Sequence, residues 1–531
     1  MTLSEAMIAI LKSAGVKFIF GVPGGGSSLD LIAAADEAEL PFILFRGETS
    51  AALAASVAAE LTGAPGVVLT AIGPGAASAV NGAAYAYLER APLILICDAR
   101  EVEQLLPPHQ VFDLQAMFRP ITKACVRLAS EVGSQQFAEL AALVQQTPEG
   151  PALVELSAAV AAGSAGLDTV SPDISLADNG SRGASENALK LLATSKRPIL
   201  LVGLQAVRSG GGKLLQRLGE RLGCPIMTTY KAKGVISDSH PQVIAHLTGA
   251  DSEAAAIRRA DLVLWAGVEP VELIPAPWRP EVPLLALSDR PGLQYPATPH
   301  AELLGPLSES VDMILNAGCP SAWLAEEIAD LREEYKQRLR LPGGKGHTVE
   351  SVADAVIKAF PSNTRFTVDA GAHMLSVMAR IQAHESLQVL KSTGLSTMGF
   401  ALPAAIGSSL VDPRRRVVAF TGDGGLLMCL AELSTAARLG CCLTVIVIND
   451  AALSLIDLKQ QRRQHRSIGV RYPAVDFASA AKGQGCVAWT VDHKDPLEAV
   501  LTGALTHEGP SLIDIRVDPS PYGEQLAALR G

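Results

Sequence analysis

Two aspartates, Asp423 and Asp450, have the type and spacing that metal chemistry requires. Asp423 stands between glycines in a Gly-Asp-Gly turn, and Asp450 follows 443–448, whose β-branched and aliphatic residues predict a buried strand. An apolar-striped segment between the two predicts a helix. A strand-helix-strand unit returns both carboxylates to the same end of a parallel sheet, where α/β proteins bind ligands. Two carboxylate oxygens and a phosphate form the hard-ligand arrangement that Mg²⁺ prefers.

The glycines around the first aspartate fit the same chemistry. Gly422 and Gly424 let backbone amides approach an anion at a helix N-terminus, where unpaired N–H groups and the helix dipole favour phosphate. A Gly-Asp-Gly sequence alone is also a common tight turn without any function. The turn therefore indicates a function only in combination with the helix, strand and polar pair that come after it in the chain.

A Gly-Asp-Gly turn followed by a helix, a strand and an Asn-Asp pair resembles the thiamine-diphosphate-dependent enzymes of the acetolactate synthase, pyruvate decarboxylase and benzoylformate decarboxylase superfamily. The resemblance implies that Asp423, Asp450 and the main-chain carbonyl of Ala452 bind the Mg²⁺ that holds the coenzyme. Asp450 departs from the family, in which this position is usually Asn. Because a further carboxylate beside a diphosphate must be offset by the cation, we expect a stronger dependence on added metal.

A third acid, Glu48, lies where a predicted strand at 42–45 meets an alanine-rich helix. Open α/β sheets place functional groups at such junctions, although an acid at a helix start can equally offset the helix dipole. The resemblance implies that Glu48 hydrogen-bonds the aminopyrimidine ring of the coenzyme and activates it as the catalytic acid. Such a role requires a carboxyl group whose pKa is raised by burial.

The segment 107–123 resembles a loop of the acetolactate synthases. Gln110 matches a glutamine that lines their active site, and His109 stands where an aromatic residue is usual. The two are the candidate polar pair on this side of the site, although a loop histidine beside prolines can equally be a surface residue. The histidines that decarboxylases of this superfamily carry in the first domain are absent, since 70–72 read Thr-Ala-Ile. The resemblance therefore favours carboligation over simple decarboxylation.

Further segments complete the implied coenzyme site. Gly371, Ala372 and His373 resemble a turn that meets the diphosphate, where an imidazole can donate to oxygen. Met398 matches a bulky apolar residue that wedges between the two coenzyme rings, and the Ser396 carbonyl matches the acceptor for the amino group. We also expect 453–456 to line a pocket for a small substrate. The predicted cofactor-binding residues are Glu48, Gly371, Ala372, His373, Ser396, Met398, Gly422, Asp423, Gly424, Gly425, Asp450, Leu453 and Leu455.

Alternating strand-like and helical segments predict an α/β protein with three doubly wound parallel-sheet domains. We place a pyrimidine-binding domain at 1–165, a central Rossmann-like domain at 187–318 and a diphosphate-binding domain at 346–531. A glycine turn, helix and strand recur in the first and third domains, which predicts that the two are related. The stretch 158–185 is rich in Gly, Ser, Asp and Pro and predicts a linker.

In the central domain, 203–213 lacks the glycine spacing of nucleotide-binding loops and is interpreted as a plain loop. FAD binds the equivalent domain in biosynthetic acetolactate synthases and ADP binds it in some acyl-CoA enzymes. The charged signature of the FAD forms is not evident at 267–278. FAD is therefore not favoured as a cofactor, and we expect thiamine diphosphate and Mg²⁺.

Composition excludes several classes of partner. The chain has 531 residues with 44 basic and 54 acidic side chains, and its basic groups at 414–416 and 462–466 are short and read as solvated faces. We therefore expect no nucleic acid partner. No run of about eighteen apolar residues predicts a membrane span. Eight cysteines without zinc-site spacing, together with no secretory signal, indicate a cytoplasmic protein.

The resemblance implies decarboxylation of a 2-oxo acid followed by carboligation, as in acetolactate synthases. Three alternatives stay open: a non-ligating 2-oxo acid decarboxylase, a 2-hydroxyacyl-CoA lyase and, from another class, an inactive cofactor-binding regulatory subunit. The resembling enzymes build each site from the first domain of one subunit and the third domain of another. We therefore expect a homodimer or a homotetramer with sites at subunit interfaces.

Overall fold

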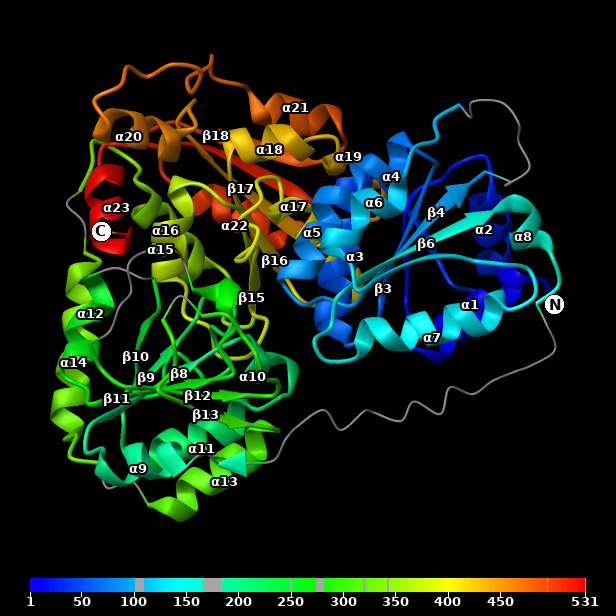
Figure 1. The fold of residues 1–531 in the computed structure, drawn as a ribbon. Coiled ribbons are helices and arrows are strands. Elements are labelled where there is room, and N and C mark those ends of the chain that lie inside the picture. The colour runs from blue at the N-terminus through cyan, green and yellow to red at the C-terminus, as the bar shows by residue number, and fades with distance from the viewer. Residues whose placement is uncertain are drawn as a thin grey trace.

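Three α/β units make up the protein (Figure 1), which confirms the predicted fold class. The computed structural model describes residues 1–100, 109–165, 183–184, 186–248, 251–273, 281–295, 297–318, 321–340, 343–493 and 495–530. The first unit is blue to cyan in Figure 1, the central unit is green, and the third runs from yellow to red. Among the described residues, no helix has the length and apolar character needed to cross a membrane.

The first unit is a six-stranded parallel sheet with the strand order β2-β1-β3-β4-β6-β5. Its strands are β1 (Ile19–Val22), β2 (Phe42–Leu44), β3 (Gly66–Thr70), β4 (Leu93–Ala99), β5 (Ala124–Arg127) and β6 (Pro151–Ser157). Its helices are α1 (Leu3–Ser13), α2 (Ser27–Glu37), α3 (Glu48–Thr62), α4 (Pro74–Ser78), α5 (Val80–Leu88), α6 (Leu114–Phe118), η1 (Arg119–Ile121), α7 (Gly133–Gln145) and α8 (Ala158–Ala162).

The third unit repeats this topology. Its parallel sheet has the order β15-β14-β16-β17-β19-β18, which is the same arrangement of six strands and confirms that the two units are related. Its strands are β14 (Arg365–Val368), β15 (Val389–Lys391), β16 (Val417–Gly422), β17 (Leu443–Asn449), β18 (Val487–Val491) and β19 (Ser511–Arg516). Its helices are α15 (Val349–Ala359), α16 (Ala372–Arg380), α17 (Ala401–Val411), α18 (Asp423–Cys429), α19 (Glu432–Arg438), α20 (Ser454–Arg462), α21 (Phe477–Gly483), α22 (Glu498–Thr506) and α23 (Tyr522–Arg530).

The central unit has a sheet of the order β10-β9-β8-β11-β12-β13-β7. Six strands are parallel, and the short edge strand β7 is antiparallel to β13, which the prediction of a parallel sheet did not include. The strands are β7 (Gly183–Ala184), β8 (Pro198–Val202), β9 (Ile226–Thr228), β10 (Val243–His246), β11 (Leu262–Ala266), β12 (Leu284–Ser288) and β13 (Ala301–Leu304). The helices are α9 (Glu186–Thr194), α10 (Leu204–Arg208), α11 (Gly212–Leu222), α12 (Asp251–Arg258), η2 (Pro270–Glu272), α13 (Leu307–Ala317) and α14 (Ala325–Arg338).

Two segments predicted to lack regular structure are partly helical. The stretch 203–213 is not a plain loop, because it holds α10 and the start of α11. The predicted linker likewise begins with α8, whose N-terminus is capped by the Ser157 side chain accepting a 3.4 Å hydrogen bond from the Val160 amide. Alanine has the highest helix propensity, so the run after this cap favours a helical turn.

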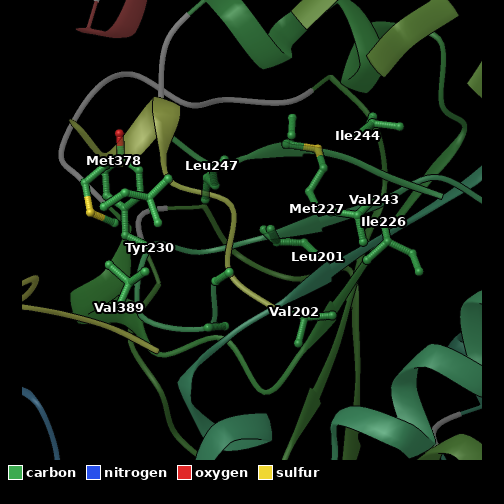
Figure 2. Close-up of a cluster of buried hydrophobic side chains, with 14 of the residues drawn as sticks. Leu201, Val202, Ile226, Met227, Tyr230, Val243, Ile244, Leu247, Met378 and Val389 are labelled. Carbon is green, nitrogen blue, oxygen red and sulfur yellow. The ribbon is translucent and has the colours of Figure 1, made fainter. Parts of the chain in front are cut away.

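The core is continuous between the central and third units. Figure 2 shows Met378 of α16 and Val389 of β15 beside Tyr230, together with the apolar side chains of β8, β9 and β10. Buried apolar area is the main source of folding free energy. The two units are therefore held as one packed body rather than as loosely tethered domains.

The first and third units meet through α3 and α17, which pack along each other. A Cβ atom at Gly407 would lie 2.5 Å from the Ala54 carbonyl oxygen, so the two backbones nearly touch. Only a glycine permits such an approach. The contact explains why α3 is rich in alanine, and it fixes the first unit of the chain against the third.

Candidate active site

A cavity of about 720 Å³ lies in the third unit, where β14, β16 and β17 end. This is the position at which open α/β sheets bind their ligands. Each residue of the third unit predicted to bind cofactor or metal lines it: Gly371, Ala372, His373, Ser396, Met398, Gly422, Asp423, Gly424, Gly425, Asp450, Ala452, Leu453 and Leu455. Their role in binding stays a prediction, whereas their common position is a property of the fold.

Asp423 is buried at the start of α18 with one carboxylate oxygen unsatisfied. Its Oδ1 accepts hydrogen bonds from the Tyr472 hydroxyl at 2.9 Å and the Gly424 amide at 2.7 Å. Its Oδ2 has no hydrogen-bond partner among the described residues. Burial raises the pKa of this carboxyl group despite those donors. A buried acceptor without a partner is costly, so the unsatisfied oxygen points to a ligand that would satisfy it.

Asp450 enters the same cavity from the end of β17. Its Oδ2 accepts a 2.7 Å hydrogen bond from the Ser454 hydroxyl. Burial raises the pKa of Asp450 to about 6, and the negative charge of Asp423 contributes to this rise. Two carboxylates that destabilise each other's charge are stabilised by a cation between them.

His373 is the second group with an unsatisfied polar atom. Its ring lies against Gly371 and Gly422, since a Cβ atom at these glycines would be 2.8 Å and 3.3 Å from the imidazole. The side chain is buried, which lowers its pKa to about 4, and its Nε2 has no partner among the described residues. A neutral imidazole can still donate one hydrogen bond to an anionic oxygen.

Three sequence profiles of one enzyme family match this chain in order. The thiamine pyrophosphate enzyme N-terminal TPP binding domain matches residues 1–117, the central domain matches 185–286, and the C-terminal TPP binding domain matches 369–515. The last match spans most of the cavity. The chain belongs to the thiamine pyrophosphate enzymes.

Full-length relatives of this thiamine pyrophosphate enzyme include acetolactate synthases. The acetolactate synthase of Bacillus subtilis (strain 168) is 28% identical over 97% of this chain and 93% of its own length. The catabolic acetolactate synthase of Raoultella terrigena is also 28% identical, over 97% and 95%. The large subunit of acetolactate synthase isozyme 1 of Escherichia coli (strain K12) is 26% identical over 97% and 94%.

The cavity fits thiamine diphosphate, which is the same compound as thiamine pyrophosphate, together with a magnesium ion. Among the described residues, no group of three or more His, Cys, Asp and Glu side chains could hold a metal. Two carboxylates and a main-chain carbonyl leave ligand positions open. Mg²⁺ commonly fills such positions with phosphate oxygens and water. The unsatisfied atoms of Asp423 and His373 suit this assembly, since one can meet the cation and the other can donate to phosphate.

Met398 and Ser396 lie on a loop that crosses this cavity. Ser396 has a positive φ of 52°, which is rare for a residue with a side chain. A Cβ atom at Gly424 would lie 2.6 Å from Leu453 Cδ2 and 3.5 Å from Met398 Cε, so these apolar groups gather over the glycine. The loop of Ser396 and Met398 therefore packs against the turn at Gly424.

Glu48, His109 and Gln110 belong to the first unit and do not line the cavity of the same chain. Glu48 is half-buried at the first turn of α3, and burial raises its pKa. The turn at Gly73 to Gly75 lies between Glu48 and Gln110. A Cβ atom at Gly75 would lie 3.0 Å from Glu48 Oε1, and one at Gly73 would lie 2.1 Å from the Gln110 carbonyl oxygen. His109 and Gln110 are both exposed, and of the two only Gln110 is placed near Glu48 by this turn.

Sequence reasoning missed four residues with polar side chains in the cavity region. Tyr472 is held near Asp423 because the segment beside it forms a bridge between Ala452 and Arg471, and no local motif announces this. Tyr522, Lys459 and Arg462 line the cavity. All of 462–466 is exposed, which confirms the interpretation of this run as a solvated face, and Arg462 in addition borders the cavity. Helical spacing from Leu455 could have indicated Lys459 and Arg462.

The carboxyl ends of the central strands β8, β11 and β12 enclose a far smaller space. The cavity there measures about 90 Å³, against several hundred Å³ for ordinary cofactor pockets. Glu269 fills its centre, accepting a 2.9 Å hydrogen bond from Gln205 and forming ion pairs with Arg90 and Arg290. The described residues thus leave less space here than an ordinary cofactor pocket has, and the expectation that FAD is not favoured stays a prediction.

Proposed function

We propose that this protein decarboxylates a 2-oxo acid and joins the remaining fragment to a second carbonyl compound, as an acetolactate synthase-like carboligase. The observation that carries the proposal is the pair of carboxyl groups in one cavity, the buried Asp423 and the half-buried Asp450, with the unsatisfied His373 imidazole beside them. Full-length similarity to acetolactate synthases supports carboligation over the other reactions of the family.

The chain's own residues would hold the coenzyme and exclude water. Asp423, Asp450 and the Ala452 carbonyl would bind Mg²⁺, and His373 would donate to the diphosphate. Thiamine diphosphate, when bound, supplies the electron sink that the loss of CO₂ from a 2-oxo acid requires. Met398 and Leu453 would cover its rings with apolar surface, which strengthens every polar interaction inside the site.

We also propose that two copies of the chain complete each site. The cavity holds no described residue of the first unit of its own chain, and Glu48 lies elsewhere with Gln110. Exposed apolar side chains border both halves: Leu427 and Met428 on α18, and Val111, Phe112 and Met117 before and on α6. Such surfaces commonly mark protein interfaces. A homodimer or homotetramer that seats Glu48 of one copy over the cavity of another would bury them.

The reaction can be tested with pyruvate, thiamine diphosphate and Mg²⁺. Acetolactate as the main product would support the proposal. Acetaldehyde alone would replace it with simple decarboxylation, and cleavage of a 2-hydroxyacyl-CoA would replace it with lyase activity. Absence of turnover, together with no proton exchange at C2 of the bound coenzyme, would indicate an inactive regulatory subunit.

The oligomeric state and location have separate tests. Sedimentation of the purified protein should give a dimer or tetramer, and a monomer at micromolar concentration would contradict a shared site. We further propose a cytoplasmic location, supported by six cysteines that are free thiols: Cys97, Cys125, Cys429, Cys441, Cys442 and Cys486. Fractionation of the source cells would test it.

A further inference from the structure

Lys459 and Arg462 bring positive charge to the cavity that would hold the coenzyme. Both residues line it from α20, and both are exposed at its rim rather than buried in its floor. The sequence offered only a basic run at 462–466 without a function. The structure therefore assigns part of that run to the site.

The geometry of α20 makes the placement specific. Residues three and four apart share a face of a helix, so Leu455, Lys459 and Arg462 form one stripe facing the cavity. The next residue, Arg463, is exposed and does not line the cavity. The stripe thus begins with an apolar side chain near the cavity interior and ends with two cations at the mouth.

The acids of this region do not neutralise the Lys459 ammonium. Asp457, the acid within α20, accepts hydrogen bonds from Arg471 and Ser467 instead. The carboxylates among the described lining residues are Asp423, at the glycine turn, and Asp450, which follows β17 and accepts a hydrogen bond from Ser454. Both would be occupied by the metal ion in the proposed function. The charge of Lys459 is then left for a different ligand.

We infer that Lys459, supported by Arg462, binds a second anionic group of the substrate. The substrate class is a 2-oxo acid that carries a further carboxylate, sulfonate or phosphonate at its far end. This inference rests on the proposed function and narrows it. The apolar side chains between Leu453 and Ile456 would contact the carbon chain between the two charged ends.

The negative net charge of the chain repels a substrate with two negative charges. Cations beside the binding site are needed to offset this repulsion. The formal net charge is −10, which lowers the local concentration of dianions near the surface. Charge-assisted hydrogen bonds from an ammonium or guanidinium group can offset this and are stronger than neutral ones. A 2-oxo acid of the same length without the second charge would gain nothing from them.

The test compares substrates that differ only in the second charge. One pair is 2-oxoglutarate and 2-oxopentanoate, and another is sulfopyruvate and 2-oxobutanoate. We expect kcat/KM for at least one dianion to exceed that of its singly charged analogue by about tenfold. Lys459→Gln should lower this ratio by about tenfold, with most of the loss in KM. Arg463→Gln, which removes a neighbouring cation outside the cavity, should leave the ratio unchanged.

Several results would overturn the inference. A wild-type preference for both singly charged analogues would exclude the substrate class. An equal loss on both members of a pair in Lys459→Gln would reduce Lys459 to a structural role. Weaker binding of thiamine diphosphate by Lys459→Gln in calorimetry, with an unchanged substrate ratio, would assign the cation to the diphosphate. Turnover of no 2-oxo acid at all would instead refute the proposed function itself.

Discussion

The Lys231 ammonium lies 2.8 Å from Glu60 Oε2, and both side chains are sealed from water. The same ammonium lies 3.1 Å from Glu89, which accepts hydrogen bonds from the amides of Thr393 and Gly394. Lys231 belongs to the central unit, both acids belong to the first, and the amides belong to the third. All three units therefore meet in one buried ionic network. Its members in the third unit, the amides of Thr393 and Gly394, directly precede the loop of Ser396 and Met398.

Removal of the central cation should destabilise the protein strongly. Burial alone would lower the pKa of Lys231, but Glu60 and Glu89 outweigh that effect and raise it. Lys231→Met would remove the cation beside the buried Glu89 and leave the buried Glu60 with Arg208 alone, 3.8 Å away; removing one partner of such a buried pair typically costs about 3–5 kcal/mol. Urea unfolding followed by circular dichroism would measure the loss.

A surface pair provides the control for this measurement. Lys190 and Glu186 form an i,i+4 ion pair with both side chains largely exposed, and such pairs contribute only about 0.3–0.5 kcal/mol. Lys190→Met should therefore shift the unfolding midpoint little. Equal effects of the two substitutions would mean that the buried network contributes no more than a surface pair.

Glu48→Gln should separate coenzyme binding from catalysis. The glutamine keeps the shape and can still form a hydrogen bond, but it cannot exchange a proton as the carboxyl group does. We expect kcat to fall by about 10²–10⁴-fold, with little change in the thiamine diphosphate affinity measured by calorimetry. Glu37→Gln, an exposed acid on α2, is the matched control. An active Glu48→Gln variant would refute the assigned role.

Asp450→Asn should lower the requirement for divalent cation. The pKa of about 6 reflects burial and the neighbouring charge of Asp423, a repulsion that the metal must offset. An amide at this position removes one negative charge beside the diphosphate. We expect the ratio of the thiamine diphosphate affinities with and without Mg²⁺ to fall on the order of tenfold, measured by calorimetry. An unchanged Mg²⁺ dependence would show that the second carboxylate does not set the metal requirement.

Local patterns predicted most of the fold and much of the site. The strands expected at 443–448 and 42–45 match β17 and β2 to within one residue, because each is a short apolar run that ends at a turn. Asp423 and Asp450 could be paired from sequence because one strand-helix-strand unit joins them. In contrast, the prediction of a plain loop at 203–213 is wrong because the glycines around α10 masked a single short helical turn.

Contacts between distant segments could not be predicted. The partners of Lys231 lie in α3 and at the end of α5, and nothing near any of them in sequence signals the others. The position of Lys459 could not be predicted from the sequence for a similar reason. Its place at the cavity depends on how α20 packs in the third unit, whereas the residues that follow it at 460–463 are all polar or charged.

Acid sensitivity should depend on His246 of β10. This side chain is buried, and its Nδ1 lies 2.7 Å from the Thr228 hydroxyl, while its Nε2 contacts Lys233 and lies 3.6 Å from Asp238. Burial, reinforced by the positive charge of Lys233, lowers its pKa to about 3 from the ordinary 6.5. The imidazole is therefore neutral in the folded protein at any pH near neutrality.

The sign of the resulting pH dependence is set by linkage. Between pH 6.5 and about 3 the unfolded chain binds a proton at His246 that the folded chain does not, so stability falls as pH falls through this window. One proton corresponds to about 1.4 kcal/mol per pH unit. His246→Gln should lower stability at pH 7 and flatten the decline between about pH 6 and 5, measured as urea midpoints. The exposed His465→Gln is the control. A decline as steep in His246→Gln as in the wild type would mean that other groups cause the acid sensitivity.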